Sequence, residues 1–578
     1  MSPSTGVDPF TVEVIKRALV SAAEQMFAAL GRTAKSSVIY EVLDYGCAIT
    51  DARGRMIAQA NGIPPFIGVL GDAVVDVVAK FGLDGLSEGD IIIMNDPYMG
   101  GATHQNDVVL VMPVFYQGKP FMFAANKAHW NDIGGKDPGS WTTDATEVYQ
   151  EGLIFPAVKL YEAGKESPAV VDVLARNGRI PDMTLGDMRA QAASLQVAAR
   201  RVVQICDKYG LDTVLRSVDV YMEQGRQEAF AQLARLPKGQ FTAEDWIDDD
   251  GLGGDPVPVK VKITIGERQF MVDFSGTGPT ARGPINTPLS AAMSEVKLAY
   301  KAVVSPHSHA NDGLFAPLRV NIPEDTVFNP KAPAPVGAYW ESGGYVGDLI
   351  WKALADVIPE RITAGHFLTV GATIVGGIDD HSGEWFFCVE PNAGGWGAGR
   401  GKDGESGLVC SGDGETYVLS VEVAETRYPF LVDQFAFNVV DGGHGQWRGG
   451  FGLVKDYRIT NSSAFVTASF GRHRFPPWGL AGGMSGTPNA VEIRTADGRV
   501  ERRGRVSNWP LARNDVVRFI TGMGGGYGDP KQRDSQAVLA DVLDGLMTKE
   551  TARDVYGVAV AGDPPQLDMA ATKRLRGG

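Results

Sequence analysis

Two histidines and two aspartates lie within one short stretch of this chain, and their spacing could place them around one metal ion. The stretch Gly100 to Gly135 reads GGATHQNDVVLVMPVFYQGKPFMFAANKAHWNDIGG and contains His104, Asp107, His129 and Asp132. Imidazole nitrogen and carboxylate oxygen together suit Zn, Mn or Fe, and a site built from strand ends can keep a coordination position open for water or substrate. A single histidine at a strand end is more often a surface or satisfied polar residue, so the hypothesis depends on the convergence of all four side chains.

A β-hairpin is the element that would position these side chains. Two apolar runs, Asp107 to Phe115 and Pro120 to Ala128, flank a short polar connection that contains Gly118, which is typical of a hairpin turn. If the numbers of paired residues sum to about 235, Asp107 lies opposite Ala128, and the open end of the hairpin brings the four polar side chains together. A slip of one residue reverses the face that each side chain presents, so spacing alone does not decide between a metal site and satisfied polar residues.

Length and composition indicate a large globular protein. A chain of 578 residues with 44% apolar residues can bury sizeable cores, and its net charge of −15 argues against a nucleic-acid partner. No apolar run approaches the ~18 residues of a membrane span and the N-terminus lacks the pattern of a signal peptide, so we expect a cytoplasmic protein with no membrane partner. The four cysteines are far apart without a CxxC pair, which fits reduced thiols.

The order of the predicted elements indicates an α+β fold that is rich in β structure, has a helical middle region and carries the metal site at the open end of the hairpin. Helical periodicity begins after Asp8 and recurs from Leu70 to Phe81, and strict alternation marks a strand from Val257 to Ile265. The last ten or so residues have the composition of a frayed end. We expect four parts, namely an α+β metal-site domain at 1–182, helices at 183–240, a β-rich domain at 241–418 and a glycine-rich β domain with C-terminal helices at 419–578.

Asp44 falls within a predicted strand from Val38 to Ile49. Alternating apolar residues such as Tyr45 and Cys47 share one face of that strand, which puts Asp44 on the other face. The residue type and position alone indicate a solvated carboxylate.

Other polar residues have a structural and a functional interpretation. Glu147 and Glu151 could line the site, but at four residues apart they are more typical of one solvated helical face. Arg448, Arg472 and His473 lie in glycine-rich segments, where we expect them to hold turns. The segments SGTGPTARGPINTP and GGWGAGRGKDGESG lack the Lys-Ser/Thr ending of a phosphate loop and are interpreted as loops, so no nucleotide site is expected in this chain.

The run NDPYMGGATHQNDVVLVMPVFYQGK, followed by AHWNDIGG and PGS, resembles the B subunit of ATP-dependent hydantoinases. That family is similar to one half of 5-oxoprolinase, to a caprolactamase subunit and, more distantly, to a subunit of acetone and acetophenone carboxylases. The resemblance implies that His104, Asp107 and His129 are metal ligands and that Asp44, in EVLDYGCAITDARGR, is a further acidic ligand. Phe66 stands where family members often have a histidine, so any role of that histidine is in doubt here.

The function that the resemblance implies is the metal-dependent subunit of an ATP-dependent cyclic amidohydrolase, which opens a hydantoin, lactam or 5-oxoproline-like ring. One divalent metal, Zn or Mn, would activate water or polarise the carbonyl, with Asp107, His129 and Asp132 as the catalytic residues. A separate A subunit of about 700 residues, a length that suggests several domains, would bind ATP-Mg at an actin-like site. We expect an obligate assembly with two copies of each chain, (αβ)2.

Three alternatives stay open at this point. A carboxylase subunit of the acetone or acetophenone type would use the same metal, although such chains tend to be longer. Two histidines and one carboxylate also form the facial triad of a mononuclear iron oxygenase. A metal closed off by four protein ligands would instead be structural, and the chain would then be a scaffold for its partner.

Overall fold

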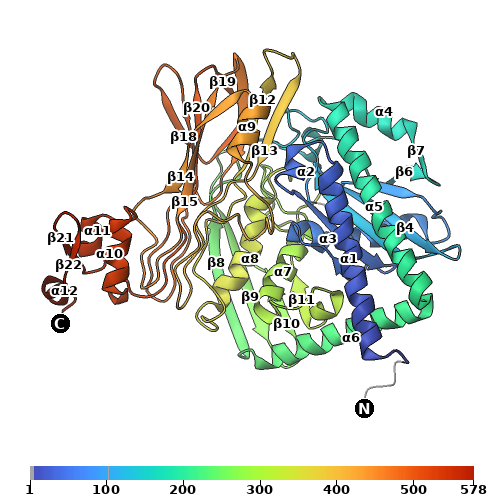
Figure 1. The fold of residues 1–578 in the computed structure, drawn as a ribbon, viewed down its shortest axis with the longest axis horizontal. Helices are drawn as coiled ribbons and strands as arrows, with labels where there is room; N and C mark the ends of the chain where they lie inside the picture. The colour runs from blue at the N-terminus through green and yellow to red at the C-terminus, as the bar shows by residue number, and fades with distance from the viewer. Residues whose placement is uncertain (1–5, 102, 578) are drawn as a thin grey trace.

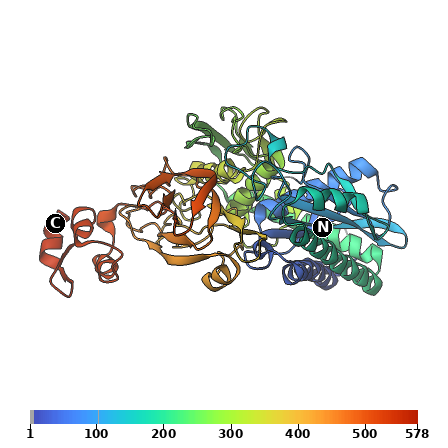
Figure 2. The ribbon, with the colours of Figure 1, turned by 90° about the horizontal axis from the view of Figure 1, so that it is seen from above.

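The computed structural model describes residues 6–101 and 103–577 and has a mixed α+β fold, as predicted from the sequence. The N-terminal part is a sheet with long helices, the middle part is a second sheet with two helices, and two further sheets follow (Figure 1). A small C-terminal lobe projects from one end of the molecule (Figures 1 and 2). No helix within the described ranges is long and apolar enough to cross a membrane.

The N-terminal part is organised around a seven-stranded sheet. Its elements are α1 (Pro9–Thr33), α2 (Ser37–Tyr40), β1 (Tyr45–Asp51), β2 (Met56–Gln59), α3 (Pro64–Phe81), β3 (Ile91–Met94), β4 (Asp107–Tyr116), β5 (Lys119–His129), η1 (Val148–Gln150), β6 (Val158–Glu162) and β7 (Lys165–Glu166). The strand order is β2-β1-β5-β4-β3-β6-β7. Alternate strand residues join two separate cores, such as Cys47 with α1 on one face and Ala48 with α3 on the other.

The middle helices were predicted from periodicity and are present. They are α4 (Pro168–Asn177), α5 (Pro181–Tyr209) and α6 (Leu211–Arg235). Helix α5 packs on the same face of the sheet as α1, where Gln191 accepts a hydrogen bond from Trp130 Nε1 at 2.6 Å and donates to Asn126 at 3.1 Å. These bonds hold the end of the hairpin strand β5 against the helix.

The hairpin of β4 and β5 is confirmed, but its register at the open end differs by one residue from the prediction. Gln117 and Gly118 form the turn with φ values of 51° and 79°, and next to it Phe115 pairs with Pro120 as expected. A bulge between Val114 and Phe115 then shifts the register, so Asp107 pairs with His129 and not with Ala128. The shift brings Asp107 and His129 directly opposite each other.

The predicted strand from Val38 to Ile49 is wrong in its first half. Residues Ser37–Tyr40 form α2, and the chain reverses at Leu43, whose φ of 63° is incompatible with a strand. β1 therefore begins only at Tyr45, and Asp44 lies at the kink, where its backbone N–H donates to Val38 O at 2.9 Å and its carbonyl accepts from His129 N at 3.1 Å.

The middle part of the chain contains a four-stranded sheet covered by two helices. Its elements are β8 (Gly239–Ile247), β9 (Val257–Ile265), β10 (Phe270–Asp273), α7 (Leu289–Val304), η2 (Asp312–Phe315), β11 (Leu318–Asn321) and α8 (Trp340–Leu354). Apolar residues of α7 and α8 share one core with the sheet. Helix α7 also contacts α3, because Ser294 Oγ donates to Pro64 O at 3.2 Å.

Two antiparallel sheets form a sandwich in the third part. They comprise β12 (Ala372–Ile378), β13 (Trp385–Glu390), β16 (Ser463–Ser469) and β19 (Arg505–Ala512), which pack on β14 (Phe430–Asn438), β15 (Gly452–Ile459), β17 (Ala490–Arg494), β18 (Val500–Arg503) and β20 (Val516–Ile520), with α9 (Val421–Arg427) at one end. Alternate residues of β12 face opposite ways: Val375 joins the sandwich core, and Ile374 joins the core of the N-terminal sheet.

The glycine-rich segments are loops, as predicted, and they pack backbone against backbone. A Cβ added at Gly449 would lie 1.9 Å from Gly524 O, so only glycine permits this approach. The C-terminal lobe follows, with η3 (Pro530–Gln532), α10 (Ser535–Leu543), α11 (Lys549–Asp554), β21 (Ala559–Ala561), β22 (Gln566–Asp568) and α12 (Met569–Leu575). The expected frayed end is wrong, because Asp568 caps α12 by accepting from Ala571 N at 2.8 Å.

Candidate metal centre and its cavity

The open end of the hairpin brings His104, Asp107 and His129 together. Asp107 Oδ1 lies 2.9 Å from His104 Nε2 and 3.1 Å from His129 Nδ1, and all three residues are buried. Thr103 donates to the other oxygen of Asp107 at 2.5 Å. Burial by itself raises the pKa of Asp107, but the charge of His104 and the hydrogen bonds from both histidines lower that pKa well below its usual range.

The geometry of these three residues fits a divalent metal. Ligand atoms bound at ~2.1 Å to one ion lie about 3.0–3.4 Å apart, which is close to the two distances just given. One ligand atom from each residue lies within 4.8 Å of the others. The second ring nitrogen of each histidine, His104 Nδ1 and His129 Nε2, is buried and has no hydrogen-bond partner among the described residues. The imidazole and carboxylate donors suit Zn or Mn.

Asp44 lines the same cavity as the three residues but lies outside their closest group. Burial raises the pKa of Asp44 to about 7, and the positive charge of His129 opposes this shift. The expectation of a solvated carboxylate is therefore wrong. Its role as a fourth ligand stays a prediction.

The structure does not bring Asp132 to the cavity. Its carboxylate is buried and points away, where it accepts from Arg179 Nη1 at 2.9 Å and from the backbone N–H groups of Gly139 and Arg179 at 3.0 and 2.8 Å. Sequence spacing could not reveal this, because the strand pairing ends at His129 and the chain turns away after it. We interpret Asp132 as the residue that holds this turn.

The two glutamates at 147 and 151 do not form a solvated helical face. Glu147 is exposed and precedes a single 3-10 turn, whereas Glu151 is buried and accepts from the backbone of Val336 and Gly337 at 3.0 and 2.7 Å. Burial raises the pKa of Glu151 to about 8. Neither residue lines the cavity, but Glu151 fixes the segment that leads to Tyr339.

A cavity with about 70 Å³ of accessible space extends from the three residues toward the middle part of the chain. We call the part of the lining that comes from outside the N-terminal sheet the far wall. It carries carboxyl and hydroxyl groups, including Glu295, Tyr339 and Asp413. None of the described residues that line it is a lysine or an arginine. Phe66 also lines the cavity, with its ring 5.0 Å from the buried Lys127 Nζ, and a phenyl ring offers no ligand atom to a metal.

The far wall was missed in the sequence. Glu295 could have been found, because it follows Ala292 by three residues and precedes Ala299 by four, which places it on the buried apolar face of α7. Asp413 and Tyr339 lie in or beside loops and carry no such signal.

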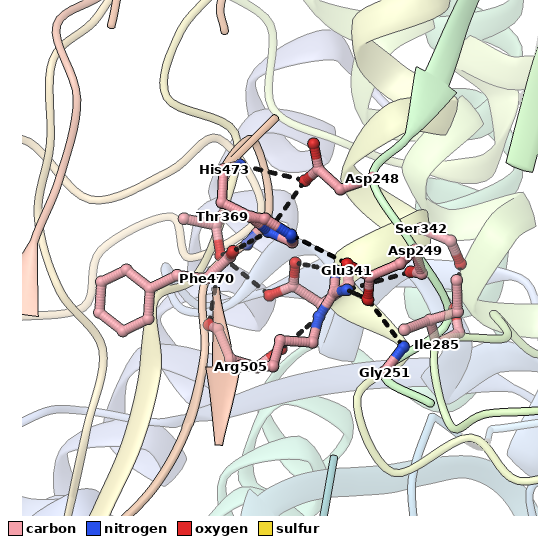
Figure 3. A network of polar contacts seen from close by, with 12 residues as sticks. Asp248, Asp249, Gly251, Ile285, Glu341, Ser342, Thr369, Phe470, His473 and Arg505 are labelled. Carbon is pink, nitrogen blue, oxygen red and sulfur yellow. Dashed lines mark hydrogen bonds and ion pairs between the residues drawn. The ribbon is translucent and has the colours of Figure 1, made fainter. Parts of the chain in front are cut away.

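Behind the far wall lies a buried network of charged residues (Figure 3). Arg505 pairs with Asp249 at 2.6 Å and with Glu341 at 3.2 Å, and Glu341 also accepts from Thr369 at 2.9 Å. Glu341 follows directly after two residues of the cavity wall, and Thr369 lies between Leu368 and Val370, which also line it. The network therefore supports the cavity from behind.

The polar residues of the glycine-rich segments take part in ion pairs, which agrees with the prediction that they hold turns. Arg472 pairs with Asp348 at 2.7 Å, and His473 pairs with Asp249 at 2.9 Å. Arg448 pairs with Asp541 at 3.2 Å, which ties the C-terminal lobe to the sandwich.

Comparisons with known proteins place the whole chain in one family. Residues 8–530 match the family described as hydantoinase B/oxoprolinase. The chain is 33% identical over 99% of its length to the B subunit of a putative D-/L-hydantoinase from Pseudomonas sp. (strain NS671), of which it covers 98%. It superposes with a TM-score of 0.90 on a chain of the ATP-dependent caprolactamase from Pseudomonas jessenii, at 30% identity and covering 99% of this chain and 100% of that one.

An acetone carboxylase in its nucleotide-free form shares the fold, with a TM-score of 0.91 at 19% identity, covering 98% of this chain and 82% of that one. The family match spans most of the chain, and the hydantoinase relative aligns with it from end to end. This chain belongs to the hydantoinase B/oxoprolinase family.

Proposed function

We propose that this chain is the metal-dependent subunit of an ATP-dependent enzyme that opens a cyclic amide ring. The observation that carries the proposal is the group of His104, Asp107 and His129 on the wall of a cavity that is lined by apolar and acidic side chains. Family membership supports the same reaction, since relatives are named for hydantoinase and caprolactamase activity.

The three residues would hold the metal, with Asp44 as the candidate for a fourth ligand. When bound, the metal would supply a Lewis acid that polarises the ring carbonyl or activates a water molecule. The chain itself contributes the orientation of these ligands, because Thr103 fixes the second oxygen of Asp107 and the strand pairing fixes Asp107 opposite His129. Trp340 packs edge-on against the ring of His104 at 5.4 Å between centroids, and Trp141 packs against Trp340 at 5.2 Å, so an apolar surface borders the group.

A partner chain would bind ATP-Mg and activate the substrate. Opening an unstrained lactam can be unfavourable without coupling to nucleotide hydrolysis, and the glycine-rich segments here pack against each other in place of forming a phosphate loop. The hydantoinase and caprolactamase relatives are themselves named as single subunits of their enzymes, which supports a partner A subunit, in an assembly that we propose to be (αβ)2.

A carboxylase subunit is the second candidate, because the acetone carboxylase shares the fold. At 19% identity that likeness concerns the fold alone, whereas the likeness to the caprolactamase and the hydantoinase relative reaches 30% and 33%. We therefore favour ring opening over carboxylation. The family match favours ring opening over the reaction of an iron oxygenase as well.

The metal assignment is tested by elemental analysis of purified full-length variants. The double variant His104→Ala/His129→Ala should lose its bound metal, and its thermal stability should fall to that of the chelator-treated native chain. The matched control His307→Ala/His381→Ala replaces two exposed histidines and should keep the metal. Full metal occupancy in the first variant would refute the assignment.

The reaction is tested with the complex of this chain and its partner. Asp107→Asn should abolish ring opening while ATP binding by the partner and assembly of the complex persist, because only the second chemical step is removed. Ring opening at the native rate by a metal-free variant complex would show that the metal is structural.

A further inference from the structure

Glu295 presents an unpartnered carboxyl to the cavity. The residue lies on α7 with only 5% of its surface exposed, it lines the cavity, and its carboxyl makes no hydrogen bond to another described residue. Glycines on two neighbouring segments leave space for it: a Cβ added at Gly412 would lie 3.3 Å from Oε1, and one at Gly347 would lie 3.8 Å from Oε2. A buried polar group without a partner is costly in an empty site, so its position points to a ligand.

Asp413 provides a second carboxyl on the same wall. Its side chain is 6% exposed and lines the cavity, and Oδ2 is buried without a hydrogen-bond partner in the described ranges. The loop that carries it is fixed on both sides, since Asp413 N donates to Cys410 O at 3.1 Å and Tyr417 N donates to Val42 O at 3.0 Å. The Cys410 thiol also hydrogen-bonds to the Asp413 carboxyl, which leaves Oδ2 as its free oxygen.

Among the described residues, none with a positive charge lines the cavity beside these two carboxyls. The nearest buried lysines are committed elsewhere: Lys127 Nζ donates to Gly101 O at 3.0 Å, and Lys455 Nζ lies 2.9 Å from both oxygens of Glu390. Burial raises the pKa of Glu295 and of Asp413 to about 8; for Asp413 a hydrogen bond from Cys410 opposes the shift and the neighbouring Glu295 adds to it. A carboxyl oxygen accepts a hydrogen bond from an N–H group in either protonation state.

We propose that Glu295 and Asp413 contact the ring substrate directly, accept hydrogen bonds from its N–H groups, and select an uncharged ring over a ring that carries a carboxylate. The inference rests on the proposed function of the cavity. An uncharged amide or ureide ring satisfies both carboxyls through its donors. Above pH 8, where both carboxyls carry a negative charge, a substrate carboxylate would be buried beside two like charges with no lysine or arginine among the described lining residues, which disfavours its binding.

Two rings that differ in one group provide the test. 2-Pyrrolidinone and 5-oxoproline share the same five-membered lactam, and only 5-oxoproline carries a carboxylate. Calorimetry at pH 8.5, where most of both carboxyls are ionised, on the metal-loaded full-length chain should show 2-pyrrolidinone and hydantoin bound at least tenfold more tightly than 5-oxoproline. The variants Glu295→Ala and Asp413→Ala should each weaken binding of the uncharged rings by about tenfold, the loss of one to two hydrogen bonds.

Conservative variants separate substrate contact from a structural role. Glu295→Gln and Asp413→Asn keep an acceptor oxygen and remove the negative charge. They should therefore bind uncharged rings almost as tightly as the native chain does, and the difference in affinity between 2-pyrrolidinone and 5-oxoproline should become smaller. In the complex with partner and ATP, the alanine variants should raise KM with a smaller change in kcat. The control Glu415→Gln replaces an exposed carboxyl two residues from Asp413 and should change neither KM nor kcat.

Three results would overturn the inference: 5-oxoproline bound as tightly as 2-pyrrolidinone, no binding of any of the three rings, or alanine variants with native affinity and native melting temperature. If the proposed function is wrong, the experiments give a different result from these three. In that case the uncharged rings bind with the expected preference, but the complete complex with ATP does not open them. Preferred opening of 5-oxoproline would refute the selectivity and leave ring opening intact.

Discussion

Replacement of Arg505 by methionine should destabilise the fold far more than loss of a surface ion pair. The Arg505 side chain is 4% exposed and pairs with Asp249, which is 12% exposed, and with Glu341, which is fully buried (Figure 3). Methionine is apolar and of comparable length, so Arg505→Met leaves two buried carboxylates without their shared cation. Removal of one partner from a buried pair costs about 3–5 kcal/mol, because the remaining charge stays desolvated.

A matched control lies at the other end of β19. Arg513 pairs with Asp380 at 3.0 Å, but the two side chains are 57% and 29% exposed, so solvent screens the pair and Arg513→Met should cost only about 0–1 kcal/mol. Urea unfolding followed by tryptophan fluorescence gives the free energy of unfolding of both variants, since Trp340 and Trp509 lie close to the network in sequence.

A third variant tests the physical cause. Arg505→Met combined with Glu341→Gln removes one of the unpaired charges and should recover about 1–3 kcal/mol of the loss, because the neutral amide has a smaller desolvation cost. If Arg505→Met costs no more than Arg513→Met, or if the added Glu341→Gln lowers stability further by the full cost of a second lost contact, the reasoning about buried charge is wrong.

Three further changes have defined outcomes. Burial lowers the pKa of His366 from 6.5 to about 3, so the unfolded chain binds a proton that the folded chain excludes, and stability falls by about 1.4 kcal/mol per pH unit as the pH drops below 6.5. His366→Gln should flatten this slope in urea titrations between pH 6.5 and 4, and an unchanged slope would contradict it. Tyr339 faces the cavity with its ring 5.5 Å from that of His104, so Tyr339→Phe should keep the metal but lower kcat of the complex about tenfold or more, which steady-state kinetics measures. The purified chain without its partner should not bind ATP, and calorimetry that detects micromolar binding would refute that expectation.

Local signals explain what the sequence predicted. The start of α1 follows from Asp8, whose side chain accepts from Thr11 N at 3.0 Å, and the hairpin follows from the turn at Gly118. Each of these features depends on residues a few positions apart. The grouping of His104, Asp107 and His129 follows from the same hairpin, so it could be predicted before any contact between the parts of the chain was known.

Features set by a single unusual backbone position could not be predicted. The bulge next to Val114 changes which residue faces Asp107, and the positive φ of Leu43 ends a predicted strand. Neither residue type announces this conformation, because a branched apolar side chain is normally typical of regular extended structure. Tertiary packing selects both conformations.

The two sides of the cavity differ in how they are built, and this separates their functions. One hairpin supplies the three candidate ligands, whereas the far wall brings together α7, the segment before α8 and the loop at Asp413. Glu295 lies on α7, which packs on α3 and bonds to it through Ser294, and Asp413 lies on a loop that is bonded to Val42. Changes in the packing between the parts of the chain should therefore disturb the recognition of the ring before they disturb the candidate metal group. A fixed metal group with an adjustable far wall is an arrangement in which one reaction can serve different rings.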